Sequence, residues 1–245
     1  MKKTILLAAM AVAAGATGTA MAANPVLDNP ENRPYVGVRL SAESSIPGTL
    51  EVANIKKNDF DAGAGISAGI IYNQPIVANF TVEPGLELYY NTTKFNPESE
   101  LMQNKPWKAR STRSFGMRIP VMLGYHFDFS KNFGLNVATG PVLKVGFSDD
   151  YYRTSETLFT DDGDAYRIHE SGSMYKDNAY TVPGEVNAFN RVDCAWRISI
   201  GANFLKHYYA GISGDLGMVN QIKHSNNGAY SMKNNLFQFT LGYNF

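Results

Sequence analysis

The sequence lacks cysteine pairs, long apolar runs and an excess of charge of either sign. Its 245 residues include one cysteine, Cys194, so no intramolecular disulfide can form, and burial and backbone pairing must stabilise the fold. No segment approaches the roughly 18 consecutive apolar residues that a membrane-spanning helix needs. The sequence also has no excess of positive or negative charge, because it contains 22 basic and 22 acidic residues. This balance argues against a nucleic-acid-binding protein, so no nucleic-acid partner is expected.

The N-terminus carries the pattern of an export signal. Two lysines precede a short apolar run, and the small-x-small sequence Ala20-Met21-Ala22 follows it as a cleavage signal. We predict a signal peptide over 1–22 and one mature domain over 23–245. The residue directly after the predicted cleavage point is Ala23 and not a cysteine, so an N-terminal lipid anchor is not expected.

What the sequence does have is alternation with a period of two. It contains 14 tyrosines, 14 phenylalanines and 22 glycines, a composition that leans towards β structure. Several runs alternate apolar and polar residues between turn-forming residues. The eight runs span 34–42, 62–72, 79–90, 114–127, 133–147, 189–204, 208–219 and 236–245. Most are close to or longer than the roughly nine to eleven residues with which a tilted strand crosses a bilayer.

The two faces of these runs differ in charge. One face is apolar and carries no charged residue in any of the runs. The opposite face carries many glycines and a nearly balanced set of acids and bases. These charged residues are Arg39, Glu83, Glu87, Arg118, Lys144, Arg191, Asp193, Arg197 and Asp215. Such a face fits a narrow lumen in which opposite charges pair.

Two further features indicate that the apolar face points outward into a membrane. Aromatic residues collect at both ends of that face, as in the two girdles of an outer-membrane barrel. The connections between the runs alternate between long and short, and the longest is 148–188. A soluble barrel has no reason to place every long loop at one end. The predicted fold class is all-β: a transmembrane antiparallel up-and-down barrel of eight strands, or ten if the longest loop contains a further pair.

The leader, the amphipathic runs and the aromatic C-terminus together resemble the small outer-membrane β-barrel family of OmpA and OmpX. RIPVMLGYHF followed by GLNVATGPVLKVGF is similar to the PorT-like barrels of the Bacteroidetes in particular. The resemblance implies a bacterial outer-membrane location, with the loops at the cell surface and both termini in the periplasm. It also implies that the barrel-insertion machinery reads the last strand, through Phe237, Phe239, Tyr243 and Phe245. Such a resemblance transfers the fold better than the activity.

The charged face allows two interpretations of the lumen. Its side chains could line an ion path, or they could pair and plug an eight-stranded lumen, which is just wide enough for side chains. Unpaired charges in so confined a space would be costly, so we expect a plugged lumen.

The loop 148–188 is too long to be a simple connector, and loops of this length tend to be functional or disordered. Its candidate surface-binding residues are Asp161, Asp162, Asp164 and Tyr166. The aspartates could bind a divalent cation, but DDGD lacks the remaining ligands of a calcium loop. A solvated acidic loop is therefore favoured, and no metal site is predicted.

We expect a monomeric scaffold that contacts outer-membrane lipid and lipopolysaccharide and presents its loops to an extracellular protein or glycan. The alternative is a small pore or transport accessory. A loop-borne hydrolase or acyltransferase would use His169 and Ser171, or His224 and Ser225, but no catalytic motif surrounds them. No enzyme activity and no cofactor are therefore predicted.

Three prolines conflict with the strand pattern. Pro84, Pro120 and Pro141 fall inside predicted strands, where proline removes a donor from the hydrogen-bond ladder. We expect bulges or local kinks at these positions.

Overall fold

The computed structural model describes most of the predicted mature domain. The described residues are 34–48, 50–52, 55–57, 61–94, 107–130, 132–155, 158–159, 162–163, 165–175, 180–182, 185–205, 207–223 and 230–245. The predicted signal peptide over 1–22 lies outside them. Every element in this part of the chain is a β-strand, and it includes no helix long and apolar enough to span a membrane.

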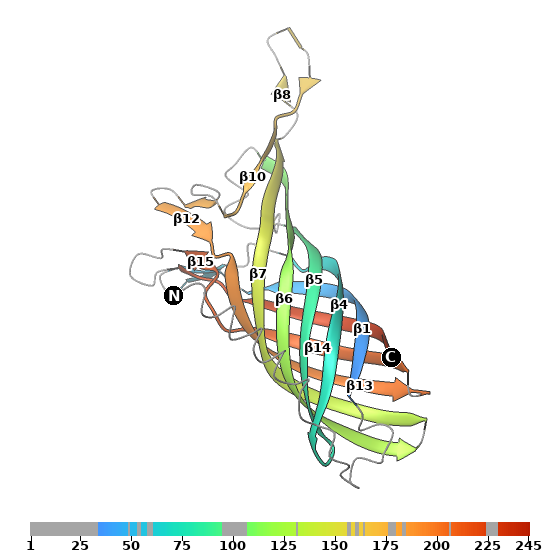
Figure 1. Ribbon diagram of the computed structural model, residues 1–245. Helices are drawn as coiled ribbons and strands as arrows, with labels where there is room; N and C mark the ends of the chain where they lie inside the picture. Colours follow the sequence, from blue (N-terminus) through green and yellow to red (C-terminus); the bar gives the residue numbers. More distant parts are fainter. Residues whose placement is uncertain are drawn as a thin grey trace.

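Eight long strands form the wall of a barrel (Figure 1). They are β1 (Tyr35–Pro47), β4 (Gly63–Val77), β5 (Phe80–Lys94), β6 (Trp107–Ser130), β7 (Phe133–Ser155), β13 (Val192–Phe204), β14 (Tyr208–Gly217) and β17 (Asn234–Asn244). Each contains most of one alternating run of the sequence. The predicted eight-stranded antiparallel barrel is therefore confirmed, and the ten-stranded alternative is not.

The wall is a continuous ring. Each wall strand pairs antiparallel with the next one along the chain, and β17 returns to pair with β1. This closing ladder runs from the Gly37–Asn244 pair to the Pro47–Asn234 pair. A closed ring pairs both sides of every wall strand, which a backbone that crosses lipid requires.

The apolar face of the wall points outward. Burial alternates strictly along most of β1, and the outward residues Leu40, Leu123 and Ile198 are 60%, 51% and 50% exposed. The charged face points into the lumen, where Arg118 and Arg197 are 2% and 5% exposed. So much exposed apolar surface marks a wall that faces lipid rather than water.

Aromatic rings gather at both ends of the outer wall. At the end with the short connections, Phe80 packs edge-on against Tyr125 with ring centroids 4.8 Å apart. The same end holds the Tyr243–Phe245 pair, at 4.9 Å. At the other end, Phe115 and Phe147 form a T-shaped pair at 5.5 Å. These two groups occupy the predicted positions of the girdles.

No register shift marks a bulge at the three strand prolines, so that part of the expectation of bulges or local kinks is wrong. The register is the same on both sides of Pro84 in the β5–β6 ladder and of Pro120 in the β6–β7 ladder. Pro141 pairs with Trp196 in an uninterrupted β7–β13 ladder. The register shifts lie elsewhere, at Pro75/Val77, Trp107/Ala109, Phe115/Gly116 and Asp128/Ser130. A missing ladder bond is tolerated here because the neighbouring pairs on both sides hold the strand in place.

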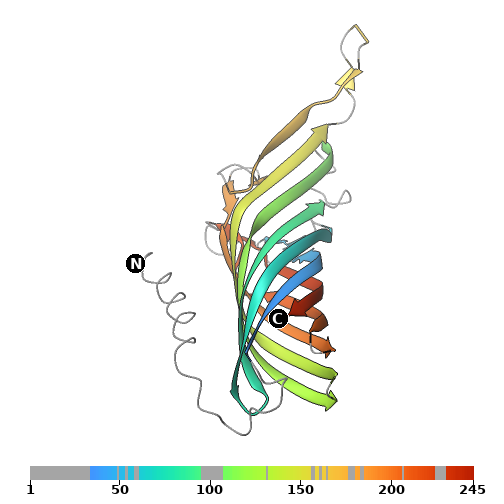
Figure 2. The same cartoon turned by 45° about the vertical axis from the view of Figure 1, so that its right-hand side comes forward.

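The long-loop end carries additional small strands. β6 and β7 continue well beyond the other wall strands, and β10 (His169–Ser173) pairs with the projecting part of β7 (Figures 1 and 2). Above them lies a hairpin of two short strands, β8 and β9. The other short strands form two small sheets near the mouth. The bounds are β8 (Leu158–Phe159), β9 (Ala165–Tyr166), β2 (Leu50–Val52), β3 (Ile55–Lys57), β16 (Tyr230–Ser231), β11 (Tyr180–Val182), β12 (Glu185–Phe189) and β15 (Ile222–Lys223).

Candidate functional site

The strongest polar feature of the barrel is a chain of ion pairs in its lumen. Arg118 on β6 donates two hydrogen bonds to Glu43 on β1, both at 2.6 Å, in a bidentate pair. Its Nη1 also lies 3.5 Å from a carboxylate oxygen of Glu87, its neighbour on β5. Bidentate arginine–carboxylate pairs of this geometry are among the strongest polar contacts in proteins.

The chain continues from Glu87 to a second arginine. Arg197 on β13 donates to both oxygens of Glu87, at 2.6 and 3.2 Å. The same guanidinium donates to both oxygens of Asp215 on β14, at 2.6 and 2.9 Å. We call the five residues Glu43, Arg118, Glu87, Arg197 and Asp215 the ion-pair chain.

The ion-pair chain crosses the lumen instead of following the wall. In the ring, two strands separate β1 from β6, and two others separate β5 from β13. The Glu43–Arg118 and Glu87–Arg197 contacts therefore join strands that do not touch, whereas Arg197 and Asp215 are direct cross-strand neighbours. Contacts of the first kind can form only through the interior of the barrel.

Neutral side chains complete the partners of Glu43. Gln238 on β17 donates its Nε2–H to Glu43 Oε1 at 2.8 Å, and the Ser213 hydroxyl donates to the side-chain Oε1 of Gln238 at 2.9 Å. Tyr89, which is buried, lies beside the chain with the Arg118 guanidinium 4.3 Å from its ring centroid. Buried charges are tolerated when partners satisfy them in this way.

A second polar cluster lies nearer the short-turn end. Glu83 accepts hydrogen bonds from Asn136 at 2.8 Å and from Thr81 at 3.3 Å. His126 Nε2 lies 3.9 Å from the same carboxylate. Arg39 is buried, with its guanidinium 4.2 Å from the ring centroid of Tyr209.

Small cavities lie on both sides of the ion-pair chain. A cavity of about 60 Å³ is lined by Glu87 and Arg197 together with Arg39 and Glu83 on the short-turn side. On the other side, a cavity of about 30 Å³ is lined by Arg118. Each has room for only a few water molecules, and the ion-pair chain lies between them.

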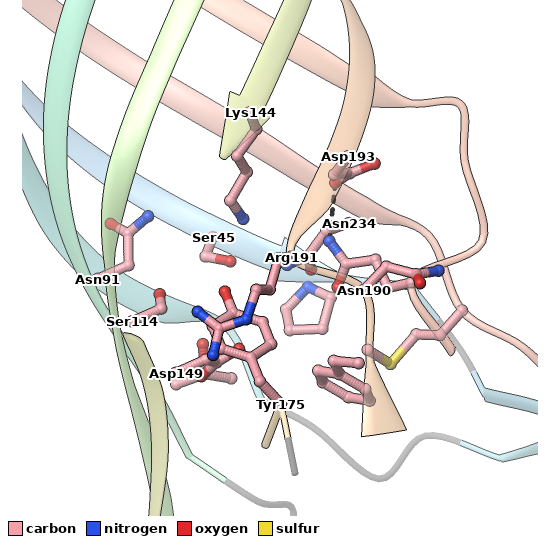
Figure 3. Close-up of a pocket in the computed structure, with 15 residues that line it drawn as sticks. Ser45, Asn91, Ser114, Lys144, Asp149, Tyr175, Asn190, Arg191, Asp193 and Asn234 are labelled. Atoms are coloured by element: carbon pink, nitrogen blue, oxygen red, sulfur yellow. Dashed lines mark hydrogen bonds between the residues drawn. The ribbon is translucent and has the colours of Figure 1, made fainter. Parts of the chain in front are cut away.

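A polar cup of about 40 Å³ lies at the long-loop end of the lumen (Figure 3). Lys144 and Asp193 line both this outer cup and the 30 Å³ cavity beneath it. Arg191 is exposed at the rim, donates to the Phe147 carbonyl at 3.1 Å and lies 4.6 Å from the Tyr175 ring centroid. Arg191 precedes the first residue of β13, and its contacts are with Phe147 and Tyr175. It therefore lies at the mouth of the barrel and is not part of the ion-pair chain.

Asp149 is a second acidic group of the outer cup. It lies two residues beyond Phe147, whose ring belongs to the aromatic girdle at the long-loop end, and so above the apolar band. Burial raises the pKa of Asp149 to about 7, while Lys144 opposes the shift and Asp150 adds to it. Its Oδ1 is buried and has no hydrogen-bond partner among the described residues.

The structure describes two of the four candidate surface-loop residues, Asp162 and Tyr166. Tyr166 is exposed in β9, opposite Leu158 of β8, and Asp162 is exposed beside the hairpin. Asp161 and Asp164 lie outside the described residues. Within the described ranges, no group of three or more His, Cys, Asp or Glu side chains could hold a metal ion.

The enzyme alternative rests on residues that are only partly described. His169 and Ser171 lie on β10, where His169 Nδ1 is 3.2 Å from the Thr154 hydroxyl. His224 and Ser225 lie outside the described residues. The contact with Thr154 belongs to the β7–β10 ladder and forms no triad.

The aromatic terminal strand completes the ring. Phe237, Phe239 and Tyr243 lie on β17 with their side chains outward, and Phe245 directly follows the strand. The Phe245 backbone N–H donates to the Val36 carbonyl at 2.9 Å. Reading of this strand by the insertion machinery stays a prediction.

Two members of the lumen network were missing from the sequence-based set. Glu43 lies one residue beyond the predicted end of the first strand, and Gln238 is uncharged. Both share the lumen parity of their strands. Extending the period-two pattern by one residue would have identified Glu43.

A family model agrees with this architecture. The family model described as "Outer membrane protein beta-barrel domain" matches residues 30–223. A search of curated proteins finds no significant match. Among solved structures, OprG of Pseudomonas aeruginosa is 9% identical with a TM-score of 0.44, and the alignment covers 86% of this chain and 95% of that one. Ail of Yersinia pestis, in complex with the heparin analogue sucrose octasulfate, is 8% identical with a TM-score of 0.39, covering 87% and 99%.

Proposed function

Since the chain belongs to the outer membrane protein β-barrel domain family, we propose that it is a barrel with a plugged lumen that serves as a scaffold for its surface loops. The loops face the cell exterior, and the short turns and both ends of the barrel domain face the periplasm. Short periplasmic turns and long outer loops are the usual arrangement in bacterial outer-membrane barrels.

The ion-pair chain is the observation that carries this proposal. It joins five strands through the interior, and Arg118 and Arg197 each contact two carboxylates. Opening a path would require at least one buried arginine to leave its carboxylates. That separation is costly in a lumen with little water, because it leaves buried charges without partners.

The scaffold role is supported by how the polar groups are distributed. The five charges of the ion-pair chain contact one another, whereas the β6–β7–β10 projection and the β8–β9 hairpin are held out beyond the wall. Exposed aromatic residues on that projection include Tyr152 and Tyr166. Aromatic side chains of this kind are common in protein and glycan contacts.

A small pore is the second candidate, and the cavities on both sides of the ion-pair chain favour it. If the chain separated, these cavities would lie along one path. An eight-stranded barrel nevertheless encloses little more than its own side chains. No observation on the described residues favours catalysis.

Planar-bilayer conductance separates the plug from the pore. We expect the purified wild-type barrel to give no sustained channels. Arg118→Ala and Glu87→Ala should give conductance, because each removes a group that crosses the lumen. Arg191→Ala is the matched control, since it removes a charge outside the ion-pair chain and should leave the membrane closed. Reproducible open channels in the wild type, altered by Arg118→Ala, would contradict the plugged lumen.

A further inference from the structure

The outer cup contains a cation without a carboxylate partner. Lys144 and Asp193 are direct cross-strand neighbours on β7 and β13, but they form no ion pair. Asp193 instead accepts hydrogen bonds from the Cys194 backbone N–H at 2.7 Å and from Gln221 Nε2 at 2.8 Å. Both Asp193 oxygens are thereby occupied, and the Lys144 ammonium is left facing the cavity (Figure 3).

The other neighbours of Lys144 do not neutralise it. Its cross-strand partner on β6 is Arg118, a second cation. Its Nζ lies 5.1 Å from the ring centroid of Tyr89, a contact that is weaker than an ion pair. Among the described residues, no carboxylate is within ion-pair distance of Lys144. A cation in a partly buried site without a counter-ion favours the binding of an anion.

The rest of the outer cup supplies both donors and acceptors. Arg191 at the rim uses one of its five N–H groups on the Phe147 carbonyl. The buried Oδ1 atoms of Asn91, Asp149 and Asn234 have no hydrogen-bond partner among the described residues. Asn91, Ser45 and Ser114 line the same space. With Asp149 neutral below about pH 7, the cup carries two positive charges against the single charge of Asp193.

We propose that the outer cup binds one anionic group, a carboxylate or a phosphate, that enters from the long-loop side and contacts Lys144 and Arg191. The cavity of about 40 Å³ admits such a group and not a whole oligosaccharide. The ligand is therefore a free anion or the acidic end of a larger molecule, such as an acidic glycan. If the ligand is the acidic end of a larger molecule, the cup is part of the surface that contacts the external partner. In that case the inference rests on the proposed function.

Titration calorimetry on the folded barrel in a non-ionic detergent tests this proposal, with inorganic phosphate, D-glucuronate and D-glucose as probes. Phosphate and glucuronate should bind, and glucose should not. Lys144→Gln should weaken binding by roughly tenfold or more, because it removes a charge-assisted contact. Phosphate bound much more tightly than glucuronate indicates a free anion, and the reverse indicates an acidic sugar.

The matched control is Lys233→Gln, which removes the same charge from an exposed position outside the outer cup. It should leave binding unchanged. Absent anion binding, or equal loss in both variants, would overturn the proposal. If Lys144→Gln does not fold, judged by its gel migration before and after boiling, Arg191→Gln at the exposed rim replaces it and should also weaken binding.

The pH dependence provides an independent check. Asp149 faces Lys144 and Asp150 on β7, with Tyr89 of β5 and Tyr175 beside it as uncharged neighbours. Raising the pH through about 7 deprotonates Asp149 and adds a negative charge to the cup, so the affinity for glucuronate, whose own charge is constant in this range, should fall. Asp149→Asn should remove this fall, and a fall that persists in this variant would contradict the assignment.

Failure of this inference can be distinguished from failure of the proposed function. Channels in a wild-type barrel that still binds phosphate through Lys144 would refute the plug alone. A closed barrel that binds no anion would refute the cup alone.

Discussion

Arg118 and Arg197 are the residues on which the interior of this barrel depends. Each guanidinium is almost completely buried and contacts two carboxylates. Removing either arginine leaves carboxylates that are desolvated and have lost their counter-ion. An unpaired charge in a low-dielectric interior lowers the stability of the folded state by more than the intact ion pair raises it.

We predict that Arg118→Ala lowers the free energy of unfolding by about 3–5 kcal/mol. Arg191→Ala should lower it by less than about 1 kcal/mol, because exposed charges contribute little. Urea unfolding of both variants in lipid vesicles measures the difference. Replacing Arg118 and Glu43 together with Met should cost less than Arg118→Ala alone. An equal loss for both single variants would show that burial does not govern the interaction.

The sequence predicted the composition of the lumen better than its contacts. Charge on one parity identified Glu87, Arg118, Arg197 and Asp215, because side-chain period in a strand is a local property. Which acid meets which base depends on the tilt of strands that lie opposite each other. Nothing in one strand's pattern specifies that Arg118 reaches across to Glu43.

β6 and β7 are the elements that depart most from the expected dimensions. They have 24 and 23 residues, against the roughly nine to eleven that a bilayer crossing needs. Their predicted ends, at 114 and 147, were too short at the loop side. Residues alternate between apolar and polar where one face of a strand contacts lipid. Above the apolar band the outer face no longer needs apolar residues, although the strands remain hydrogen-bonded to each other.

The β6–β7 ladder also contains a close backbone approach. A Cβ atom at Gly140 would overlap the Val121 carbonyl oxygen on β6, which is backbone and cannot rotate away. At Gly214 the nearest atom to an added Cβ is 4.0 Å distant, so that position has room. Gly140 faces the lumen, whereas Gly214 lies on the outward parity of β14 between Ile212 and Leu216, so Gly214 serves as a control at an open position.

We predict that Gly140→Ala lowers the free energy of unfolding by about 1–3 kcal/mol, as expected when an added methyl group forces a backbone shift. Gly214→Ala should change it by less than about 0.5 kcal/mol. Unfolding in lipid vesicles, followed by the fraction that keeps the folded gel migration, provides the measurement. Similar stability of the two variants would mean that the strands separate freely at Gly140.

At the scale of the whole molecule, the barrel has two unlike ends. The short connections, the start of β1 and the end of β17 lie at one end of the barrel. The long connections between wall strands are at the other end. The eight-stranded architecture followed from the sequence because strand count and loop rhythm are visible in it. The small sheets at the mouth did not, since two- and three-residue strands carry no usable periodicity.

The proposed orientation predicts which end a membrane-impermeant thiol reagent reaches. In a Cys194→Ala background, Ser171→Cys on β10 should label in intact cells. Ser130→Cys at the short-turn end should label only after the outer membrane is permeabilised. Both serines are exposed and both changes are close in size, so reactivity of the thiol itself should not differ. Labelling of Ser130→Cys alone in intact cells would reverse the orientation.

The pairing of β17 with β1 sets a condition on the order of folding. The Ser41 and Thr240 hydroxyls lie 2.8 Å apart, although 199 positions separate them along the chain. Such distant contacts make closure slow, because a long loop must form before the contact is gained. Until β17 has been synthesised and delivered, β1 has an open side that can pair with other chains. We therefore expect a product truncated before β17 to aggregate or be degraded.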